Sequence, residues 1–148
     1  WITLEAGVIQ TLRTFMTGEL FAAIQSGTLL GQGITPSSPD PAAFEEGVIR
    51  ALSDPALTAL LFSARIGRLS DQLPEASVSD YLSGLLIGAE IAAQGSCAGR
   101  SVSVIGSPEL TTRYATALKL AGWNAPHKHD SLKAGAMGLW RILEVHRP

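Results

Sequence analysis

The sequence has a single cysteine, Cys97, so no disulfide can form within the chain. Cys97 lies among small residues with no neighbouring base or cation, which argues against a nucleophilic role. Lysine and arginine form no run, and the net charge is only −2. We therefore expect no disulfide scaffold, no reactive thiol and no nucleic-acid partner.

Long apolar runs are also absent. Glycine, serine or a charged residue interrupts every apolar stretch well before the roughly 20 residues that a membrane span requires. No signal peptide is recognisable. These features predict a cytoplasmic protein without a membrane partner. The chain starts at Trp1, not at methionine, and directly in strand-like sequence, so we expect it to be a piece of a longer protein.

The residues that are present predict one folded α/β domain. Of the 148 residues, 46% are hydrophobic and 16% are charged, a composition that favours a real core over disorder. Residues 1–15 alternate as a β-hairpin, with Ala6 and Gly7 at the turn. Helical spacing follows, with Thr17 as a candidate cap of the first helix. The predicted helices span residues 17–28, 41–52, 55–69 and 77–94.

The last third of the chain alternates between strands and helices. Residues 101–105 are rich in β-branched residues and predict a short buried strand. Ser107 and Pro108 then have the pattern of a helix cap and first helical position, and Gly122 ends that helix. Helical spacing places Leu110 on the core face of this helix, and it places Ile49 with Phe44, Val48 and Leu52 on one side of the 41–52 helix. A weak strand over 123–129 and a helix over 131–145 complete the prediction.

Two strand-to-helix joints are candidates for phosphate or nucleotide binding. At the first, the strand ends at Gly106 and the helix starts at Ser107 and Pro108, which presents free backbone N–H groups and a positive dipole end. The alternative is that this joint is a plain connector without a ligand. At the second joint, Thr17 and Gly18 could approach a phosphate, but a simple helix cap is slightly favoured.

Other polar residues leave two interpretations open. Arg65, two residues after Ser63, either binds an anion or is a solvated arginine at a helix end, the commoner case. Glu90 either lines a cleft or points to solvent. His127 and His129 share one strand face without a clustered third ligand, so we assign no metal site.

Four sequence blocks carry a family resemblance. The segments FMTGELF (15–21) and DYLSGLLIGAEI (80–91) are specific, and LFSAR (61–65) and IGSPEL (105–110) support them. With these blocks the chain resembles the 2-dehydro-3-deoxygalactonokinases along nearly its whole length.

The resemblance implies a fold in the acetate and sugar kinase/actin superfamily. The expected fold class is α/β: a ribonuclease-H-like three-layer domain, in which a β-hairpin or meander precedes helices alternating with strands. Residues 1–148 would be the C-terminal nucleotide-binding domain of a two-domain sugar-acid kinase. Its N-terminal domain and the first meander strand would be missing, and this fragment alone would be inactive.

The resemblance also implies an activity: ATP-dependent phosphorylation of 2-dehydro-3-deoxy-D-galactonate to its 6-phosphate, with Mg²⁺ bridging the phosphates. The catalytic base would be an aspartate of the missing domain, so none is named here. Alternatives are a sister kinase with another sugar and a non-catalytic binding module. A homodimer stays open.

The implied site residues fall into three groups. Gly106, Ser107 and Pro108 would bind the nucleotide, with the bare backbone of Gly106 passing close to the nucleoside. Thr17, Gly18, Ser63 and Arg65 would lie near the phosphate or substrate cleft. Gly84 and Gly88, four residues apart on the 77–94 helix, would let two helices cross at the interdomain hinge, although each costs about 1 kcal/mol relative to alanine.

Overall fold

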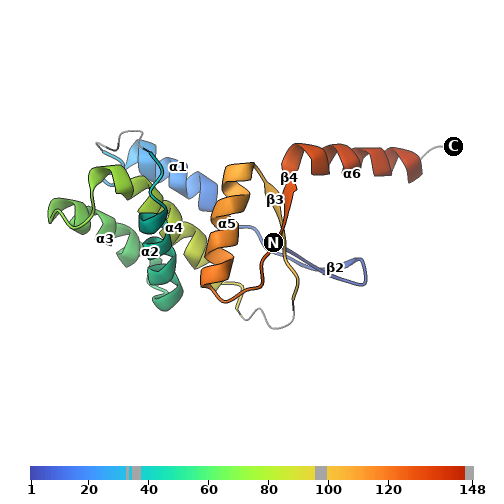
Figure 1. The fold of residues 1–148 in the computed structure, drawn as a ribbon, viewed down its shortest axis with the longest axis horizontal. Coiled ribbons are helices and arrows are strands. Elements are labelled where there is room, and N and C mark those ends of the chain that lie inside the picture. The colour runs from blue at the N-terminus through green and yellow to red at the C-terminus, as the bar shows by residue number, and fades with distance from the viewer. Residues whose placement is uncertain (33, 35–37, 96–99, 146–148) are drawn as a thin grey trace.

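The structure is a computed structural model that describes residues 1–32, 34, 38–95 and 100–145 (Figure 1). Cys97 lies outside the described residues. Within them the chain is mixed α/β, with two small sheets and six α-helices. The elements in order are β1 (Ile2–Glu5), β2 (Val8–Leu12), α1 (Thr17–Gly27), α2 (Pro41–Ser53), α3 (Leu57–Leu69), the short 3₁₀ helix η1 (Glu75–Ser77), α4 (Val78–Ala92), β3 (Ser103–Gly106), α5 (Pro108–Leu120), β4 (His127–Asp130) and α6 (Ser131–Val145).

The predicted hairpin is present. Strands β1 and β2 are antiparallel, and Glu5 pairs with Val8 across the turn. The turn residues Ala6 and Gly7 have φ angles of 48° and 79°, the left-handed pair that a tight hairpin turn requires. Thr11 and Thr3 add a cross-strand hydroxyl hydrogen bond of 2.9 Å.

Helix α4 is the centre of the helical body. Its residues Leu82 and Leu85 are fully buried, and α1, α2, α3 and α5 all contact it. Helix α2 crosses α4 at very short range: a Cβ added to Gly84 would lie 2.1 Å from the Phe44 carbonyl oxygen, and one added to Gly88 would lie 2.9 Å from that of Val48. The backbone approach expected at these two glycines is therefore found, with α2 as the partner. Their role at an interdomain hinge stays a prediction.

The second sheet joins β3 to β4 in parallel, with Ser103 opposite His127. The Ser107 side chain caps α5 as predicted, accepting a hydrogen bond of 3.3 Å from the Leu110 N–H, and Pro108 lies in the first turn. Gly122, with φ of 79°, follows the end of α5. This parallel pair places the start of α5 beside the helical body (Figure 1).

Three predicted core positions are wrong. Ile105 was expected in a buried strand and is 61% exposed, because β3 pairs only with β4 among the described strands and none of the described elements covers this side chain. Ile49 and Leu110 were expected on core faces and are 53% and 44% exposed. Each lies at the margin of its helix's apolar stripe, where periodicity alone does not decide burial.

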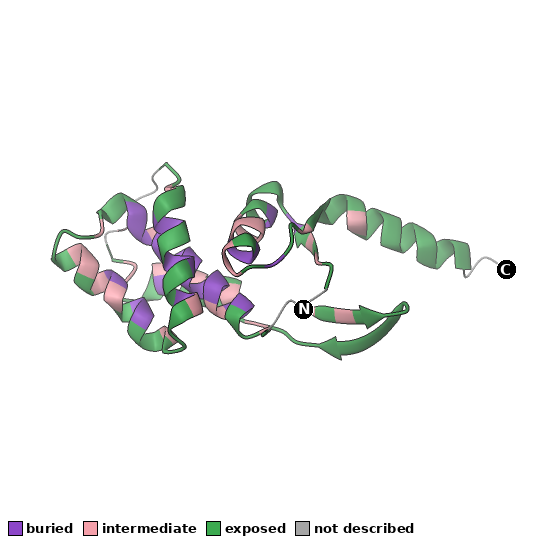
Figure 2. Ribbon diagram, turned by 60° about the horizontal axis from the view of Figure 1, so that its bottom comes forward, coloured by how far each residue is buried: buried purple, intermediate pink, exposed green. Residues whose placement is uncertain are grey.

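Burial is concentrated in the helical body, whereas the hairpin and α6 are exposed (Figure 2). No residue of α6 is buried, although seven of its side chains are large and apolar. The exposed apolar residues of the hairpin and α6 are Ile2, Leu4, Val8, Ile9 and Leu12, and Leu132, Met137, Leu139, Trp140, Ile142, Leu143 and Val145. None of the described helices is long and apolar enough to cross a membrane.

Candidate functional site

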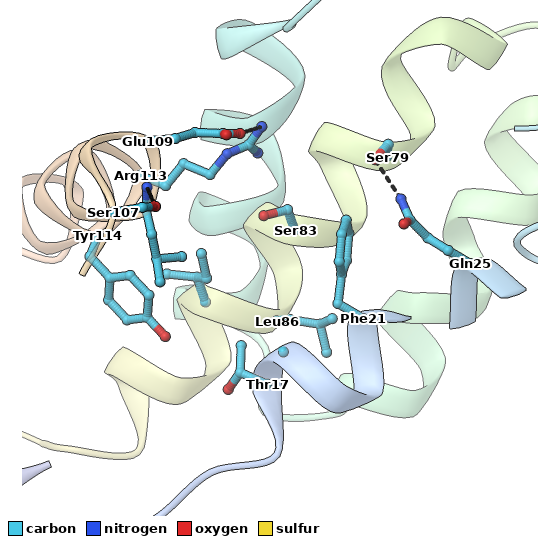
Figure 3. Close-up of a pocket in the computed structure, with 13 residues that line it drawn as sticks. Thr17, Phe21, Gln25, Ser79, Ser83, Leu86, Ser107, Glu109, Arg113 and Tyr114 are labelled. Atoms are coloured by element: carbon cyan, nitrogen blue, oxygen red, sulfur yellow. Dashed lines mark hydrogen bonds and ion pairs between the residues drawn. The ribbon is translucent and has the colours of Figure 1, made fainter. Parts of the chain in front are cut away.

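A cavity of about 510 Å³ lies between α1, α4 and α5 (Figure 3). Its volume is within the range of small-molecule sites. The lining combines apolar side chains with a few polar ones. The lining residues are Thr17, Gly18, Phe21, Gln25, Ser79, Ser83, Leu86, Ile87, Ser107, Glu109, Leu110, Arg113 and Tyr114.

The two predicted strand-to-helix joints meet at this cavity. Thr17 and Gly18 begin α1, and Ser107 caps α5, and all three line the cavity. Both helices therefore begin at the same space, and the start of α5, on the same helix as Arg113, presents a positive dipole end and backbone N–H groups that favour an anion. Gly106 and Pro108 are not among the lining residues.

The surroundings of Gly106 differ from the expectation of bare backbone against a ligand. Gly106 is buried, and a Cβ added there would lie 3.5 Å from Leu110 and 3.6 Å from Thr111. These are ordinary van der Waals contacts with the first turns of α5, so protein side chains cover the glycine on that side. The open space lies beside Ser107 instead.

Thr17 does not cap α1, contrary to the slightly favoured interpretation. The N-cap position of α1 is Met16, without a side-chain cap hydrogen bond. The Thr17 hydroxyl instead donates to Glu90 Oε2 on α4. Tyr114 of α5 donates to the same oxygen at 2.8 Å, and the Trp1 indole N–H donates to Oε1 at 2.7 Å.

Glu90 is thus a buried carboxylate that connects three separate segments to α4. It is 8% exposed, so neither open interpretation of the sequence describes it: it neither lines the cavity nor points to solvent. Burial and then the negative charge of Glu90 raise the pKa of Tyr114, which keeps the phenol protonated. Sequence reasoning missed this network because its members are up to 89 residues apart.

Arg113 is the one lysine or arginine among the described lining residues of the cavity. Its place four residues after Glu109 is the only local sequence signal for it. Its guanidinium lies 2.6 Å from Asp80 and 3.4 Å from Glu109. It also lies over the Phe44 ring, 5.3 Å from the centroid. Asp80 is buried, whereas the Glu109 side chain is 78% exposed. The Asp80 pair therefore holds Arg113 in place, and the Glu109 pair is the one that solvent weakens.

Ser63 and Arg65 are not brought into this cavity. The Ser63 hydroxyl donates to the Leu60 carbonyl at 2.6 Å and lies 3.2 Å from the Tyr81 hydroxyl. Arg65 donates to the Leu29 carbonyl at 3.1 Å, so it ties α3 to the segment after α1. The site role expected for Ser63 and Arg65 gains no support from this placement.

No metal cluster appears among the described residues. His127 and His129 lie exposed on β4, and the part of the chain that the structure describes holds no group of three His, Cys, Asp or Glu able to bind a metal ion. Glu109, paired with Arg113, is the one carboxylate among the described lining residues.

Comparison with known proteins gives consistent matches. The chain matches the model of the 2-keto-3-deoxy-galactonokinase family over residues 1–142. It is 35% identical over 124 residues to 2-dehydro-3-deoxygalactonokinase of Escherichia coli (strain K12). That match covers 82% of this chain and 42% of the Escherichia coli protein. It is 38% identical over 151 residues to "Probable 2-dehydro-3-deoxygalactonokinase DgoK1" of Rhizobium meliloti (strain 1021). That match covers 97% of this chain and 49% of the Rhizobium protein.

A solved structure agrees in fold. It is described as "a putative 2-dehydro-3-deoxygalactonokinase protein from Sinorhizobium meliloti", and it matches with a TM-score of 0.90 at 36% identity. The match covers 100% of this chain and 51% of that one. The chain therefore spans about half the length of the relatives that it matches.

Proposed function

This chain belongs to the 2-keto-3-deoxy-galactonokinase family, and on that premise we propose that it is part of a kinase that phosphorylates 2-dehydro-3-deoxy-D-galactonate. The reaction transfers the γ-phosphoryl group of ATP to the 6-hydroxyl of the sugar acid and releases ADP. The observation that carries this proposal is the family match over residues 1–142. A sister kinase with another sugar acid is the second candidate, because half of each relative lies outside the match.

The cavity between α1, α4 and α5 is the proposed nucleotide site. Phe21, Leu86 and Ile87 supply an apolar wall of the kind that suits a nucleoside. The beginning of α5 supplies backbone N–H groups, and Arg113 supplies a positive charge for phosphate oxygens. In this proposal Ser107 contacts the nucleotide and Thr17 lies at the cleft, as the sequence indicated. Gly106 does not line the cavity, and its Cα faces Leu110 and Thr111 of α5 instead.

The remaining parts of the reaction belong to the rest of the kinase in this proposal. The fold would be the C-terminal, ribonuclease-H-like half of an actin-like kinase, with Gly84 and Gly88 near the interdomain hinge. Closure of the two halves would exclude water and complete the site. The catalytic base would lie in the other half of the kinase. The protein would be located in the cytoplasm, and a homodimer remains a prediction.

Magnesium, which the resemblance implies, would be held mainly by the phosphates of the nucleotide and by water, as is usual in kinases. The described residues form no metal-binding group, and Glu109 already pairs with Arg113. What this chain can do is hold the nucleotide and balance phosphate charge through Arg113 and helix dipoles, which is the larger part of phosphoryl-transfer catalysis.

The test is ADP release by the complete protein with a panel of sugar acids. We expect the highest kcat/KM with 2-dehydro-3-deoxy-D-galactonate, and no turnover by residues 1–148 alone. A higher kcat/KM with another acid would favour the sister kinase, and absence of ADP release with every acid would favour a binding module. Activity from residues 1–148 alone would contradict the division of the site between two halves.

A further inference from the structure

Glu90 controls which way two hydroxyl groups at the cavity point their protons. The Thr17 and Tyr114 side chains both line the cavity, and both hydroxyls donate to Glu90 Oε2. An ionised carboxylate only accepts hydrogen bonds, so neither hydroxyl can be the acceptor in these pairs. Each hydroxyl has one proton, and that proton is committed to Glu90.

What remains on Thr17 and Tyr114 is accepting capacity. With their protons turned to Glu90, the two oxygens have only lone pairs left for a ligand. A tyrosine is protonated at neutral pH, and burial and the charge of Glu90 raise the pKa of Tyr114 further from that range. The Trp1 indole holds the other carboxylate oxygen at 2.7 Å, which fixes the orientation of Glu90.

We propose that Glu90 is a positioning residue that makes the Thr17–Tyr114 end of the cavity a hydrogen-bond acceptor, which selects a ligand's hydroxyl donors, namely those of a ribose. This inference rests on the proposed nucleotide site. Figure 3 shows the Thr17 and Tyr114 hydroxyls on one side of the cavity and Arg113 with Glu109 on the other. The two sides are thus opposite in character: one accepts hydrogen bonds, and Arg113 donates them.

A nucleotide has the matching order of groups. Its ribose hydroxyls can donate, whereas its phosphate oxygens only accept and carry negative charge. A phosphate at Thr17 and Tyr114 would face lone pairs and the nearby charge of Glu90, which is repulsive. The arrangement therefore places the sugar at the Thr17–Tyr114 end and the phosphates towards Arg113.

The test is equilibrium binding of four nucleotides to the complete protein without sugar acid: ATP, 2′-deoxy-ATP, 3′-deoxy-ATP and purine riboside triphosphate, which lacks the 6-amino group. We expect at least one deoxy analogue to bind roughly five- to tenfold more weakly than ATP, the effect of one neutral hydrogen bond. Loss of the 6-amino group should change binding by the same factor in the wild type and in a Glu90 variant, because the donor is assigned to the ribose, which purine riboside triphosphate retains.

The Glu90→Gln variant should bring the ratio of deoxy-analogue to ATP dissociation constants close to one. A glutamine amide donates as well as accepts, so it turns a hydroxyl proton towards the cavity. Tyr114→Phe should lower the same ratio, and this second variant provides the test if Glu90→Gln fails to fold. Glu46→Gln, which changes an exposed carboxylate paired with Arg50, is the matched control and should keep the wild-type ratio.

The outcomes separate the two proposals. ATP binding without discrimination, or discrimination that survives in both Glu90→Gln and Tyr114→Phe, would overturn the role of Glu90 and leave the kinase proposal standing. If Glu90→Gln changed the effect of removing the 6-amino group on the dissociation constant, but not the effect of removing a ribose hydroxyl, the assignment to the ribose would be overturned. Failure of the complete protein to bind ATP at all would overturn the proposed function, and this inference with it.

Discussion

At the residue scale, the stability of the fold depends on a largely buried ion pair between Arg113 and Asp80. The guanidinium is 2.6 Å from the carboxylate, and the two side chains are 23% and 8% exposed. Asp80 also accepts the Asp40 backbone N–H at 2.6 Å. Removal of Arg113 would leave a buried carboxylate without its cation, whereas exposed pairs contribute little.

We expect Arg113→Ala to lower the free energy of unfolding by about 3 kcal/mol, the cost of breaking a buried pair. Denaturant unfolding of the complete protein measures this. Asp80→Asn in the same chain should recover part of the loss, since no buried charge is then left unpaired. Arg141→Ala, which removes an exposed pair with Glu144, should change the free energy by less than about 1 kcal/mol. Equal effects of the two arginine substitutions would contradict this account.

Asp40 gives stability a dependence on acid pH. The Ser77 hydroxyl donates to Asp40 at 2.6 Å, and the Ala43 and Ala42 N–H groups of α2 donate at 3.1 Å. These bonds hold the pKa of Asp40 below its ordinary 3.8. Because the folded pKa is the lower one, the stabilisation is present above the unfolded pKa and is lost as pH falls through the folded pKa.

Asp40→Asn should therefore flatten the acid limb of stability. Asparagine still caps a helix but does not titrate, so the difference in unfolding free energy between wild type and variant should shrink as pH falls below about 4. Urea titrations at a series of pH values between 6 and 3 measure the difference. A difference that is constant over that range would show that Asp40 does not titrate as described.

At the scale of elements, the α2–α4 crossing sets the geometry of the helical body. An alanine methyl at Gly84 would lie 2.1 Å from the Phe44 carbonyl oxygen, and one at Gly47 would lie 2.3 Å from the Tyr81 carbonyl oxygen. Both contacts are with backbone, which cannot rotate away as a side chain can. The helices therefore have to separate to accept a larger residue.

Gly84→Ala should lower the free energy of unfolding by about 3 kcal/mol, at the upper end of typical overpacking costs. Gly135→Ala in α6 is the matched control, because nothing lies within 4 Å of its added Cβ, and it should stabilise α6 by up to about 1 kcal/mol. Thermal unfolding of the two variants compares them. A tolerated Gly84→Ala would mean that α2 and α4 are farther apart than described here.

The elements were largely predictable from the sequence, since local signals define them. The Ala6-Gly7 turn, the Ser107-Pro108 helix start and the Gly122 stop all depend on neighbours in the chain. The burial of β3 was not predictable in the same way: a β-branched run indicates a strand, but only the layers around it decide exposure. The prediction that Thr17 caps α1 was wrong for a related reason: its hydroxyl donates a hydrogen bond to Glu90, 73 residues away.

The candidate site was predictable only in part. The two strand-to-helix joints could be read as local patterns, and they do meet at one cavity. That Ser63 and Arg65 lie elsewhere, and that Glu90 and Arg113 join the joints together, depends on how α3, α4 and α5 pack. A single sequence carries no signal for such long-range contacts.

At the scale of the whole molecule, the apolar surface of the hairpin and α6 is the feature that matters for behaviour in solution (Figure 2). The side chains of Leu4, Leu12, Leu132 and Leu139 are 60% or more exposed. Exposed apolar patches of this kind and unpaired strand edges mark interaction surfaces or association-prone regions.

We expect the isolated 148 residues to self-associate at micromolar concentration, as sedimentation velocity would show. Replacing Leu132 and Leu139 by glutamate should lower the associated fraction, because it places charge on the exposed face of α6. The same replacement at Ser26 of α1 and Ser53 of α2, which are exposed on the helical body, is the control. Monodisperse monomers of the unsubstituted chain would contradict this expectation.

The cavity between α1, α4 and α5 is the centre of the whole account, and a crystal structure of the complete protein with ADP tests it most directly. We predict that the nucleoside lies against Phe21, Leu86 and Ile87, with its ribose at Thr17 and Tyr114 and its phosphates towards Arg113. A nucleoside bound elsewhere, with this cavity closed by protein side chains, would contradict the account.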